Sequence, residues 1–335
     1  MSDINRIITL AARPIGFPKE SDFKQIKESI PTPGENDVLI RTRYLSVDPY
    51  MRGRMNDVKS YAPPFQIGRA IDGGAVGEVV QSNNAKYAEG DIVQGNWGWM
   101  DYCLSDGAGL NKLDTSLAPM TTALGILGMP GMTAYFGFLD ICDPQEGQDV
   151  FVSGAAGAVG EIVGQIAKLK GCRVVGSAGS DEKVQRLLDE AGYDAAFNYK
   201  NESEYVSTLR SLFPKGINCY FDNVGGAMTD AVLLNLAPFA RISICGAISQ
   251  YNLEKPEMGP RLLTMLLVTQ SRAEGFIVSK FAHRFPEGIT QMAQWMKEGK
   301  LTYREDVMEG LENTPKAFIR MLNGENKGKQ LVEVS

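Results

Sequence analysis

The spacing of apolar residues along the chain changes near residue 129. From Arg6 to about Leu127 the apolar positions come in short stretches of period two, such as "DVLIRTRYLSVDPYM" and "GGAVGEVVQSN". Turn-forming residues recur between them, at 31–36, 63–64 and 89–91. Short alternating segments separated by turns are typical of an all-β barrel or sandwich. We therefore expect residues 1–128 to form a mostly β domain.

Beyond Met129 the apolar period lengthens to three or four, and expected strands alternate with expected helices. The strands are predicted at Asp149–Ser153, Arg173–Ser177, Ala195–Asn198, Asn218–Asp222, Arg241–Cys245 and Ala273–Val278. The helices are predicted at Ala158–Lys170, Asp181–Ala191, Glu202–Leu212, Ala227–Leu236, Pro260–Thr269 and Pro286–Glu298. This alternation predicts an α/β domain with a doubly wound parallel sheet, as in the Rossmann fold, over residues 129–299.

After Gly299 the pattern becomes β-like again, at "LTYREDVMEG" and at the closing "GKQLVEVS". We expect these strands, in residues 300–335, to return to the first domain. The parallel-sheet domain would then be an insertion between two parts of the mostly β domain.

Composition and charge narrow the class of protein. A chain of 335 residues with 44% hydrophobic and 22% charged residues suits a globular protein of two domains. The longest apolar runs, such as Leu262 to Val268, are too short to span a bilayer, and the start resembles no signal peptide. The formal charge of −6, without a basic cluster, argues against nucleic acid as a partner. We expect a cytoplasmic protein with a small-molecule substrate.

Metal-ligating residues are scarce in the sequence. The chain has one histidine, His283, and no CxxC pair, whereas a zinc site takes three or four protein ligands drawn mainly from His and Cys. His283 is expected on the surface or at a helix start, and no metal is predicted. The five cysteines are far apart, which suggests free thiols in a reducing compartment.

The stretch "VFVSGAAGAVGEIVGQIAKLKGCRVVGSAG" carries the clearest chemistry. An expected strand turns into an expected helix through glycines spaced G-x-x-G-x-x-G, at Gly154, Gly157 and Gly160. The first turn of a helix offers unpaired N–H groups and a positive dipole end to a phosphate. Gly157 and Ala158 would face a pyrophosphate, and Gly160 would let the helix pack closely on the strand. The pattern predicts dinucleotide binding, with a purely structural turn as the alternative.

The end of the second expected strand indicates which dinucleotide binds. NAD sites usually place an acidic residue there to hold the ribose hydroxyls. Here the strand runs into "GSAGSDEK", so that no carboxylate stands at its end, while Ser180 and Lys183 follow at the start of the next helix. This favours NADP over NAD. On spacing alone, Lys183 could equally be a solvated helix lysine.

Several motifs together resemble those of one family over nearly the whole chain. They are "SVDPYMRGRM", "GMPGMTAYFG", the glycine-rich stretch, "FNYK", "YFDNVGG", "ICGAISQYN", "GFIV", "GLENTPKAF" and "GENKGK". The sequence is similar to the zinc-independent medium-chain dehydrogenases/reductases, in the branch of prostaglandin reductases, 2-alkenal reductases and bacterial curcumin reductases. The resemblance implies a GroES-like β-barrel domain with an inserted Rossmann domain, in a homodimer.

The same resemblance implies NADPH-dependent reduction of the carbon-carbon double bond of α,β-unsaturated ketones and aldehydes. It also implies a set of cofactor contacts. These are Gly157, Ala158, Val159 and Gly160 at the phosphates, Lys183 and Tyr199 at the 2′-phosphate, Asn223 near the nicotinamide-side ribose, then Cys245, Gly246, Ala247, Ile248, Ser249 and Tyr251 in one loop, Phe276, Ile277 and Val278 in another, and Asn326. Asn223 could instead cap a helix, and Tyr199 could simply pack between sheet and helix.

Enone reduction without a metal needs hydrogen-bond donors for the enolate oxygen. The candidates are the phenol of Tyr50, which the resemblance places toward the substrate, the phenol of Tyr251, whose loop returns to the cofactor, and a ribose hydroxyl of the cofactor. Either tyrosine could instead have a packing role. Arg52 and Arg54 are interpreted as exposed turn residues outside the site, and the aromatic group Phe65, Trp97, Trp99 and Tyr102 as barrel core with a pocket lining as the alternative. Quinone reduction and a catalytically idle NADPH-binding protein remain alternative functions.

Overall fold

The computed structural model describes residues 4–334, and the chain divides into two compact units. Unit 1 comprises residues up to Leu124 together with Glu305 onward, and unit 2 spans Gly125–Arg304. The sequence placed the two boundaries at 128/129 and 299/300, so the inserted unit extends further at both ends than predicted. Both ends of the chain thus belong to unit 1.

Unit 2 is built around a six-stranded sheet with the order β10-β9-β8-β11-β12-β13, in which every neighbouring pair is parallel. The strands are β8 (Asp149–Val152), β9 (Arg173–Ala178), β10 (Ala195–Asn198), β11 (Ile217–Asp222), β12 (Leu236–Ile244) and β13 (Arg272–Gly275). The order reverses between β8 and β11, and ligands of doubly wound sheets bind outside the carboxyl ends of strands at such a point.

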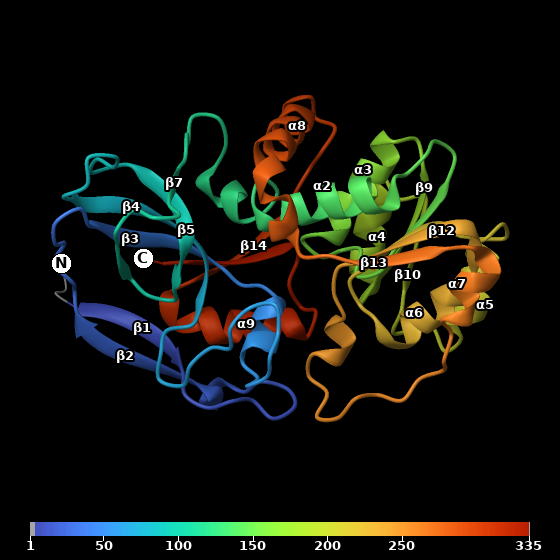
Figure 1. The fold of residues 1–335 in the computed structure, drawn as a ribbon, viewed down its shortest axis with the longest axis horizontal. Helices are drawn as coiled ribbons and strands as arrows, with labels where there is room; N and C mark the ends of the chain where they lie inside the picture. The colour runs from blue at the N-terminus through green and yellow to red at the C-terminus, as the bar shows by residue number, and fades with distance from the viewer. Residues whose placement is uncertain (1–3, 335) are drawn as a thin grey trace. The chain divides into compact units, whose positions relative to one another are not determined.

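Helices cover both faces of this sheet. They are α2 (Met129–Cys142), α3 (Gly160–Leu169), α4 (Asp181–Asp189), α5 (Tyr205–Leu212), α6 (Gly226–Leu233), α7 (Thr264–Thr269) and α8 (Phe285–Lys297), with a 3-10 helix at Val278–Arg284. Val150 and Val152 of β8 pack in one core with α2 and α3, while Phe151 between them packs in another with α5 and α6. Figure 1 shows α2 and α3 on one side of the sheet and α5 and α6 on the other. This alternation along one buried strand gives the sheet two apolar faces, as the doubly wound prediction requires.

Unit 1 holds a seven-stranded sheet and a two-stranded one. The larger sheet has the order β14-β15-β3-β4-β5-β7, with β6 also paired to β3, and the smaller is β1-β2. The strands are β1 (Ile4–Leu10), β2 (Phe23–Ser29), β3 (Val38–Ser46), β4 (Asp72–Ser82), β5 (Ile92–Gly98), β6 (Tyr102–Ser105), β7 (Asn111–Lys112), β14 (Glu305–Glu309) and β15 (Lys329–Glu333). β15 lies between β14 and β3, so the C-terminal strands complete the sheet that the N-terminal ones begin.

Unit 1 has short helical segments beside its sheets. They are α1 (Tyr50–Arg54), α9 (Thr314–Leu322) and 3-10 helices at Glu20–Asp22, Met120–Leu124 and Leu311–Asn313; a further 3-10 turn, Ile248–Gln250, lies in unit 2. β14 and β15 fall within the two β-like stretches predicted after Gly299, and between them, where no element was predicted, α9 packs Ala317, Phe318 and Met321 into the core.

Within residues 4–334, no helix combines the length and the apolar character needed to cross a bilayer.

Candidate functional site

The turn between β8 and α3 requires glycine at two positions, at Gly154 because of its backbone conformation and at Gly160 because of space. Gly154 has a φ of 61°, a left-handed conformation that L side chains rarely adopt. A Cβ on Gly160 would lie 2.5 Å from the Gly154 carbonyl oxygen and 2.8 Å from Cα of Ala155. Since both neighbours are backbone atoms, neither can move aside cheaply. Gly160 thus permits the close approach of helix to turn that the sequence predicts.

The start of α3 presents backbone N–H groups. Val159 precedes the helix and makes no capping hydrogen bond through its side chain. The Gly157 N–H donates to the Gly154 carbonyl at 3.1 Å, which closes the turn beneath the helix. Gly157, Ala158, Val159 and Gly160 therefore lie together at an uncapped helix start at the carboxyl end of β8, an arrangement that suits a phosphate group.

Ser180 and Lys183 meet at the start of α4, after β9. The Ser180 hydroxyl caps the helix by accepting a hydrogen bond from the Lys183 backbone N–H at 3.3 Å. Lys183 is half-buried. Asp181, the carboxylate that directly follows Ser180, accepts hydrogen bonds from the amides of Asn198 at 2.7 Å and Asn201 at 3.1 Å. The strand end itself carries no carboxylate, as the sequence indicates.

Tyr199 follows β10 and packs beside this helix start. Its backbone N–H donates to the Ala178 carbonyl at 3.1 Å. Its hydroxyl would lie 2.9 Å from a Cβ on Gly179, so the missing side chain at Gly179 makes room for the phenol. Burial raises the pKa of Tyr199, which stays a neutral donor. Tyr199 therefore has the packing role considered from the sequence, and its hydroxyl lies beside Gly179.

Asn223 lies at the point where the strand order reverses. Its side-chain amide donates to the Ser153 carbonyl at 2.8 Å, and its backbone N–H donates to the Ser153 hydroxyl at 3.0 Å. The residue preceding α6 is Gly225, not Asn223, so the helix-cap alternative is wrong. Asn223 instead ties the end of β11 to the end of β8.

Asp222 is a residue that the sequence analysis overlooked. It is buried, and its Oδ1 accepts hydrogen bonds from the Val224 and Gly225 N–H groups at 2.9 and 2.8 Å and from the Ser153 hydroxyl at 3.1 Å. The carboxylate therefore shapes the turn that displays Asn223. The sequence does offer a signal for this role, namely an acidic residue directly before Asn-x-Gly-Gly at a strand end. Asp side chains commonly accept hydrogen bonds from the backbone N–H groups of the turn that follows them.

The loop from Cys245 to Tyr251 folds back over this strand end. The Cys245 and Gly246 N–H groups donate to the Asp222 carbonyl at 2.9 and 3.0 Å, and the Ile248 N–H donates to the Asn223 carbonyl at 3.2 Å. The Ser249 hydroxyl donates to the Val224 carbonyl at 2.6 Å. The loop is thus anchored to the β11 end.

Tyr251 closes this loop. Its hydroxyl accepts a hydrogen bond from the Ala247 N–H at 3.3 Å and would lie 2.9 Å from a Cβ on Gly246. Burial, opposed by this hydrogen bond, raises the pKa of Tyr251. The phenol is therefore protonated at neutral pH, and its own proton is available to a further acceptor.

In the segment 276–278, Phe276 is buried, Ile277 is exposed and Val278 is half-buried. β13 ends at Gly275, three residues before the predicted end. The Phe276 ring packs into the core, where a Cβ on Gly137 would come within 2.2 Å of it, whereas Ile277 is 42% exposed. Only backbone atoms and the side chains of Ile277 and Val278 could meet a ligand here.

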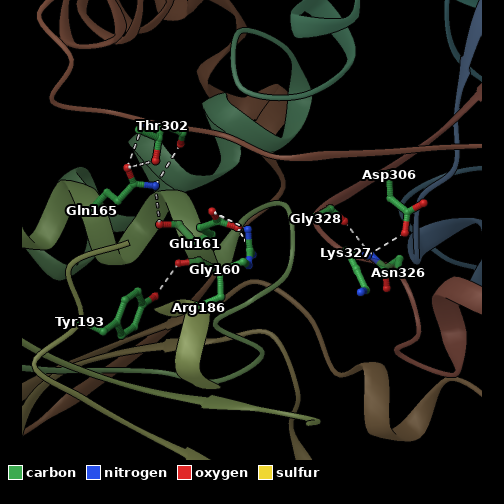
Figure 2. A network of polar contacts seen from close by, with 10 residues as sticks. All are labelled: Gly160, Glu161, Gln165, Arg186, Tyr193, Thr302, Asp306, Asn326, Lys327 and Gly328. Atoms are coloured by element: carbon green, nitrogen blue, oxygen red, sulfur yellow. Dashed lines mark hydrogen bonds and ion pairs between the residues drawn. The ribbon is translucent and has the colours of Figure 1, made fainter. Parts of the chain in front are cut away.

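Tyr50 and Asn326 belong to unit 1. Tyr50 begins α1 and is half-buried, and desolvation of its phenol, with Asp48 adding to it, raises the pKa of the phenol well above the usual value. The Asn326 side chain donates to the Gly328 carbonyl at 2.7 Å, in a turn that the Lys327 N–H holds to Asp306 (Figure 2).

The two arginines after Tyr50 are structural. Arg52 is 2% exposed and donates to Asn56 and to the Gly16 carbonyl, both at 2.8 Å, so the interpretation as an exposed turn residue is wrong. Arg54 donates to Asp72 at 2.9 Å and lies over the Phe65 ring. Phe65, Trp97 and Trp99 are buried in the core of unit 1, and Tyr102 is half-buried in β6.

Metal-ligating side chains are dispersed. In the part of the chain that the structure describes, no three of the His, Cys, Asp and Glu side chains come together as a metal site would require. His283 is exposed, in the 3-10 helix Val278–Arg284. That the protein works without a metal stays a prediction.

The chain is similar in sequence to known oxidoreductases. A family model described as the N-terminal domain of oxidoreductase matches residues 6–113, and one described as zinc-binding dehydrogenase matches residues 158–296. The NADPH-dependent curcumin reductase of Escherichia coli is 46% identical over 99% of this chain and 97% of its own. The chain belongs to the medium-chain dehydrogenase/reductase family.

Two further members of the medium-chain family are similar over their whole length. The NADP-dependent 2-alkenal reductase of Nicotiana tabacum is 46% identical over 99% of this chain and 98% of its own. The crystal structure of CurA from Vibrio vulnificus in complex with NADPH superimposes with a TM-score of 0.94, at 44% identity, over 98% of this chain and 99% of that one. The predicted fold class, an α/β Rossmann-type domain beside a separate sheet domain, is confirmed.

Proposed function

We propose that the protein catalyses the NADPH-dependent reduction of the carbon-carbon double bond of α,β-unsaturated ketones and aldehydes. The observation that carries the proposal is the pair of helix starts at neighbouring strand ends, with the uncapped start of α3 beside Gly160 and with Ser180 and Lys183 at the start of α4. Full-length similarity to reductases named for curcumin and 2-alkenals supports the choice of substrate.

The residues fit NADPH chemically. Gly157, Ala158, Val159 and Gly160 would hold the phosphates through backbone N–H groups, since a side chain at Gly160 has no room. Lys183, Ser180 and Tyr199 would hold the 2′-phosphate, where a carboxylate would repel it. The remaining contacts are proposed at Asn223, at Cys245, Gly246, Ala247, Ile248, Ser249 and Tyr251, at Phe276, Ile277 and Val278 mainly through backbone atoms, and at Asn326.

These residue roles imply different functions for the two units. We propose that unit 2, predicted at 129–299 and observed at Gly125–Arg304, is the cofactor-binding domain. Unit 1 would be the GroES-like substrate domain and would contribute Tyr50.

When bound, NADPH would supply the hydride that adds to the β-carbon of the enone. The protein's task is to meet the negative charge that develops on the carbonyl oxygen, and neutral phenols do so without changing protonation. Tyr251 is a donor of this kind, because burial raises its pKa and the Ala247 N–H orients its oxygen. Tyr50, with a raised pKa as well, is the second candidate. Water or a ribose hydroxyl can deliver the proton to the α-carbon.

Steady-state kinetics tests the proposed reaction. Purified protein should oxidise NADPH in the presence of enals and enones, and the product should be the saturated carbonyl compound. Faster turnover of simple quinones, or formation of an allylic alcohol, would assign another reaction, and NADPH binding without turnover of any of these would indicate an idle cofactor-binding protein.

Replacing Tyr251 with phenylalanine is expected to lower kcat/KM by roughly ten- to a hundredfold, about 1.4–2.7 kcal/mol. The hydroxyl would stabilise the enolate without being the sole acid, so substantial activity should remain and NADPH affinity should barely change. A loss near ten-thousandfold would make Tyr251 the obligatory proton donor. Unchanged kcat/KM across several enones would leave it a packing role, with Tyr50→Phe as the next variant to measure.

We also propose a homodimer formed through the β13 edge of the unit 2 sheet. β13 is the last strand in the sheet order, and beside it α7 and its flanks expose Leu263 (78%), Leu267 (79%) and Val268 (70%). An open edge next to exposed apolar side chains favours pairing with a second copy. Sedimentation should give a dimer, and Leu267→Glu a monomer, whereas Leu117→Glu, at an 83% exposed position in unit 1, should not change the mass.

The cytoplasm is the proposed location. All five cysteines are free thiols, and Cys142 and Cys219 lie close together in the core of unit 2 without being bonded, which suits a reducing compartment. Fractionation of cells expressing the tagged protein would test this, and recovery from a secreted or envelope fraction would contradict it.

A further inference from the structure

A buried ion pair lies directly behind the phosphate-binding turn proposed above. Glu161 follows Gly160 in the first turn of α3, and its carboxylate accepts two hydrogen bonds from Arg186 of α4, at 3.1 Å from Nη1 and 2.5 Å from Nη2. The two side chains are 7% and 8% exposed. The pair therefore joins the helix that would hold the pyrophosphate to the helix that carries Lys183.

The surroundings hold this pair in place (Figure 2). Gln165, one turn further along α3, donates to the Glu161 carbonyl at 3.2 Å and to the Thr302 carbonyl at 3.0 Å, and accepts from the Thr302 N–H at 2.8 Å. Tyr193 donates to the Gly160 carbonyl at 2.8 Å from the other side. The backbone that leads into Glu161 is thus fixed independently of the ion pair.

A carboxylate in this position poses an electrostatic problem for an anionic ligand. Glu161 is at the positive end of α3, the same end that a pyrophosphate would use. Like charges that face one another in a desolvated site cost several kcal/mol. A bidentate Arg–carboxylate pair carries no net charge, so a phosphate beside it would meet no uncompensated negative charge.

We infer that Arg186 is a positioning residue for cofactor binding, which neutralises Glu161 so that the start of α3 can accept the pyrophosphate. The inference rests on the proposed function. It differs from a merely structural role in one respect: loss of Arg186 should weaken cofactor binding and loss of Glu161 should not, although removing either breaks the same hydrogen bonds.

The experiment measures dissociation constants for NADPH and NADH in four proteins: the wild type, Arg186→Met, Glu161→Gln and the double variant. Arg186→Met should weaken both cofactors alike, by roughly ten- to a hundredfold, because the pyrophosphate is common to them. Glu161→Gln should leave affinity unchanged or raise it, since Arg186 then remains as a free cation. The double variant should return to within about threefold of the wild type, since it leaves no net charge.

A pH series adds a second readout in Arg186→Met. The charged groups that face Glu161 are Arg186 and Glu190 from α4 and Arg304 at the end of unit 2, with the Tyr193 phenol beside them. Burial already raises the pKa of Glu161 despite Arg186, and loss of the arginine raises it further. Affinity in Arg186→Met should therefore recover as the pH falls and the carboxyl group is protonated, and this recovery should be absent from the double variant.

Melting temperatures separate folding from binding. Both single variants are expected to melt lower than the wild type, so a fall in stability shared by the two does not account for a loss of affinity in Arg186→Met alone. Equal weakening of cofactor binding by both single variants would overturn the inference, as would a loss confined to NADPH. A wild-type protein that binds neither cofactor would instead refute the proposed function and the inference with it.

Discussion

Replacing Lys329 with methionine is expected to lower the free energy of unfolding by about 3–5 kcal/mol. The Lys329 ammonium donates to Asp48 at 2.9 Å and to the Val47 carbonyl at 2.9 Å, and the two charged side chains are 5% and 7% exposed. Methionine preserves the length of the side chain but leaves the Asp48 carboxylate buried without its counter-charge, and the Ser46 hydroxyl, which donates to it at 2.5 Å, is neutral. The cost is that of a buried charge without a counter-charge.

Chemical denaturation of the variant measures this effect, and Lys280→Met is the matched control. Lys280 pairs with Glu274 at 3.2 Å, but the side chains are 62% and 43% exposed, and such pairs contribute about 0–1 kcal/mol. The variant Lys329→Met/Asp48→Asn should regain part of the loss, because it removes the orphaned charge. If Lys329→Met is no more destabilised than Lys280→Met, the buried pair does not hold the turn before Tyr50.

Replacing Lys183 with alanine is expected to raise the KM for NADPH by roughly ten- to 150-fold, a loss of about 1.5–3 kcal/mol for a charge-assisted hydrogen bond. The KM for NADH should barely change, because NADH lacks the 2′-phosphate. The Ser180 hydroxyl caps α4 through the Lys183 backbone N–H, and this contact survives truncation of the side chain. The variant should therefore fold normally.

Kinetics with both cofactors distinguish phosphate binding from support of the fold. Lys297→Ala, in the last turn of α8, removes an equal charge from the same unit and should leave both KM values unchanged. Equal losses with NADPH and NADH in Lys183→Ala would show that the side chain supports the site as a whole. Such a result would return Lys183 to the role of a structural helix residue.

The elements that could be predicted are those that bury one face and expose the other, because their apolar residues then recur with a recognisable period. β10 occupies its predicted range of Ala195–Asn198, and α3 differs by one or two residues at its ends. α2 was not predicted, because 11 of its 14 residues are buried and its sequence therefore has no polar face to give a helical period. α9 does have such a face, and Pro315 in its first turn was a usable helix-start signal, although no element was predicted there.

Within the candidate site, contacts that are local in sequence were predictable and distant ones were not. The turn at Gly154 to Gly160 and the cap formed by Ser180 involve residues a few positions apart. The pairs Glu161–Arg186 and Asp48–Lys329 join residues 25 and 281 positions apart, and no spacing rule identifies a partner at such a separation. For the same reason Arg52 looked like a surface residue, since its buried partners, the Pro14 and Gly16 carbonyls, belong to another segment.

Unit 1 is assembled from two separate segments of the chain, and this affects how the chain folds during its synthesis. β15 inserts between β3 and β14, with Leu331 opposite Ser46, so β3 lacks one neighbour until the end of the chain has been translated. Unit 2 is continuous in sequence and can fold as soon as it has left the ribosome. Chains that end after Arg304 and have been released from the ribosome should therefore yield a protease-resistant fragment of residues 125–304 while residues 1–124 are cleaved, and equal resistance of both would contradict this order. The first residues to be made would thus depend on chaperones for longest.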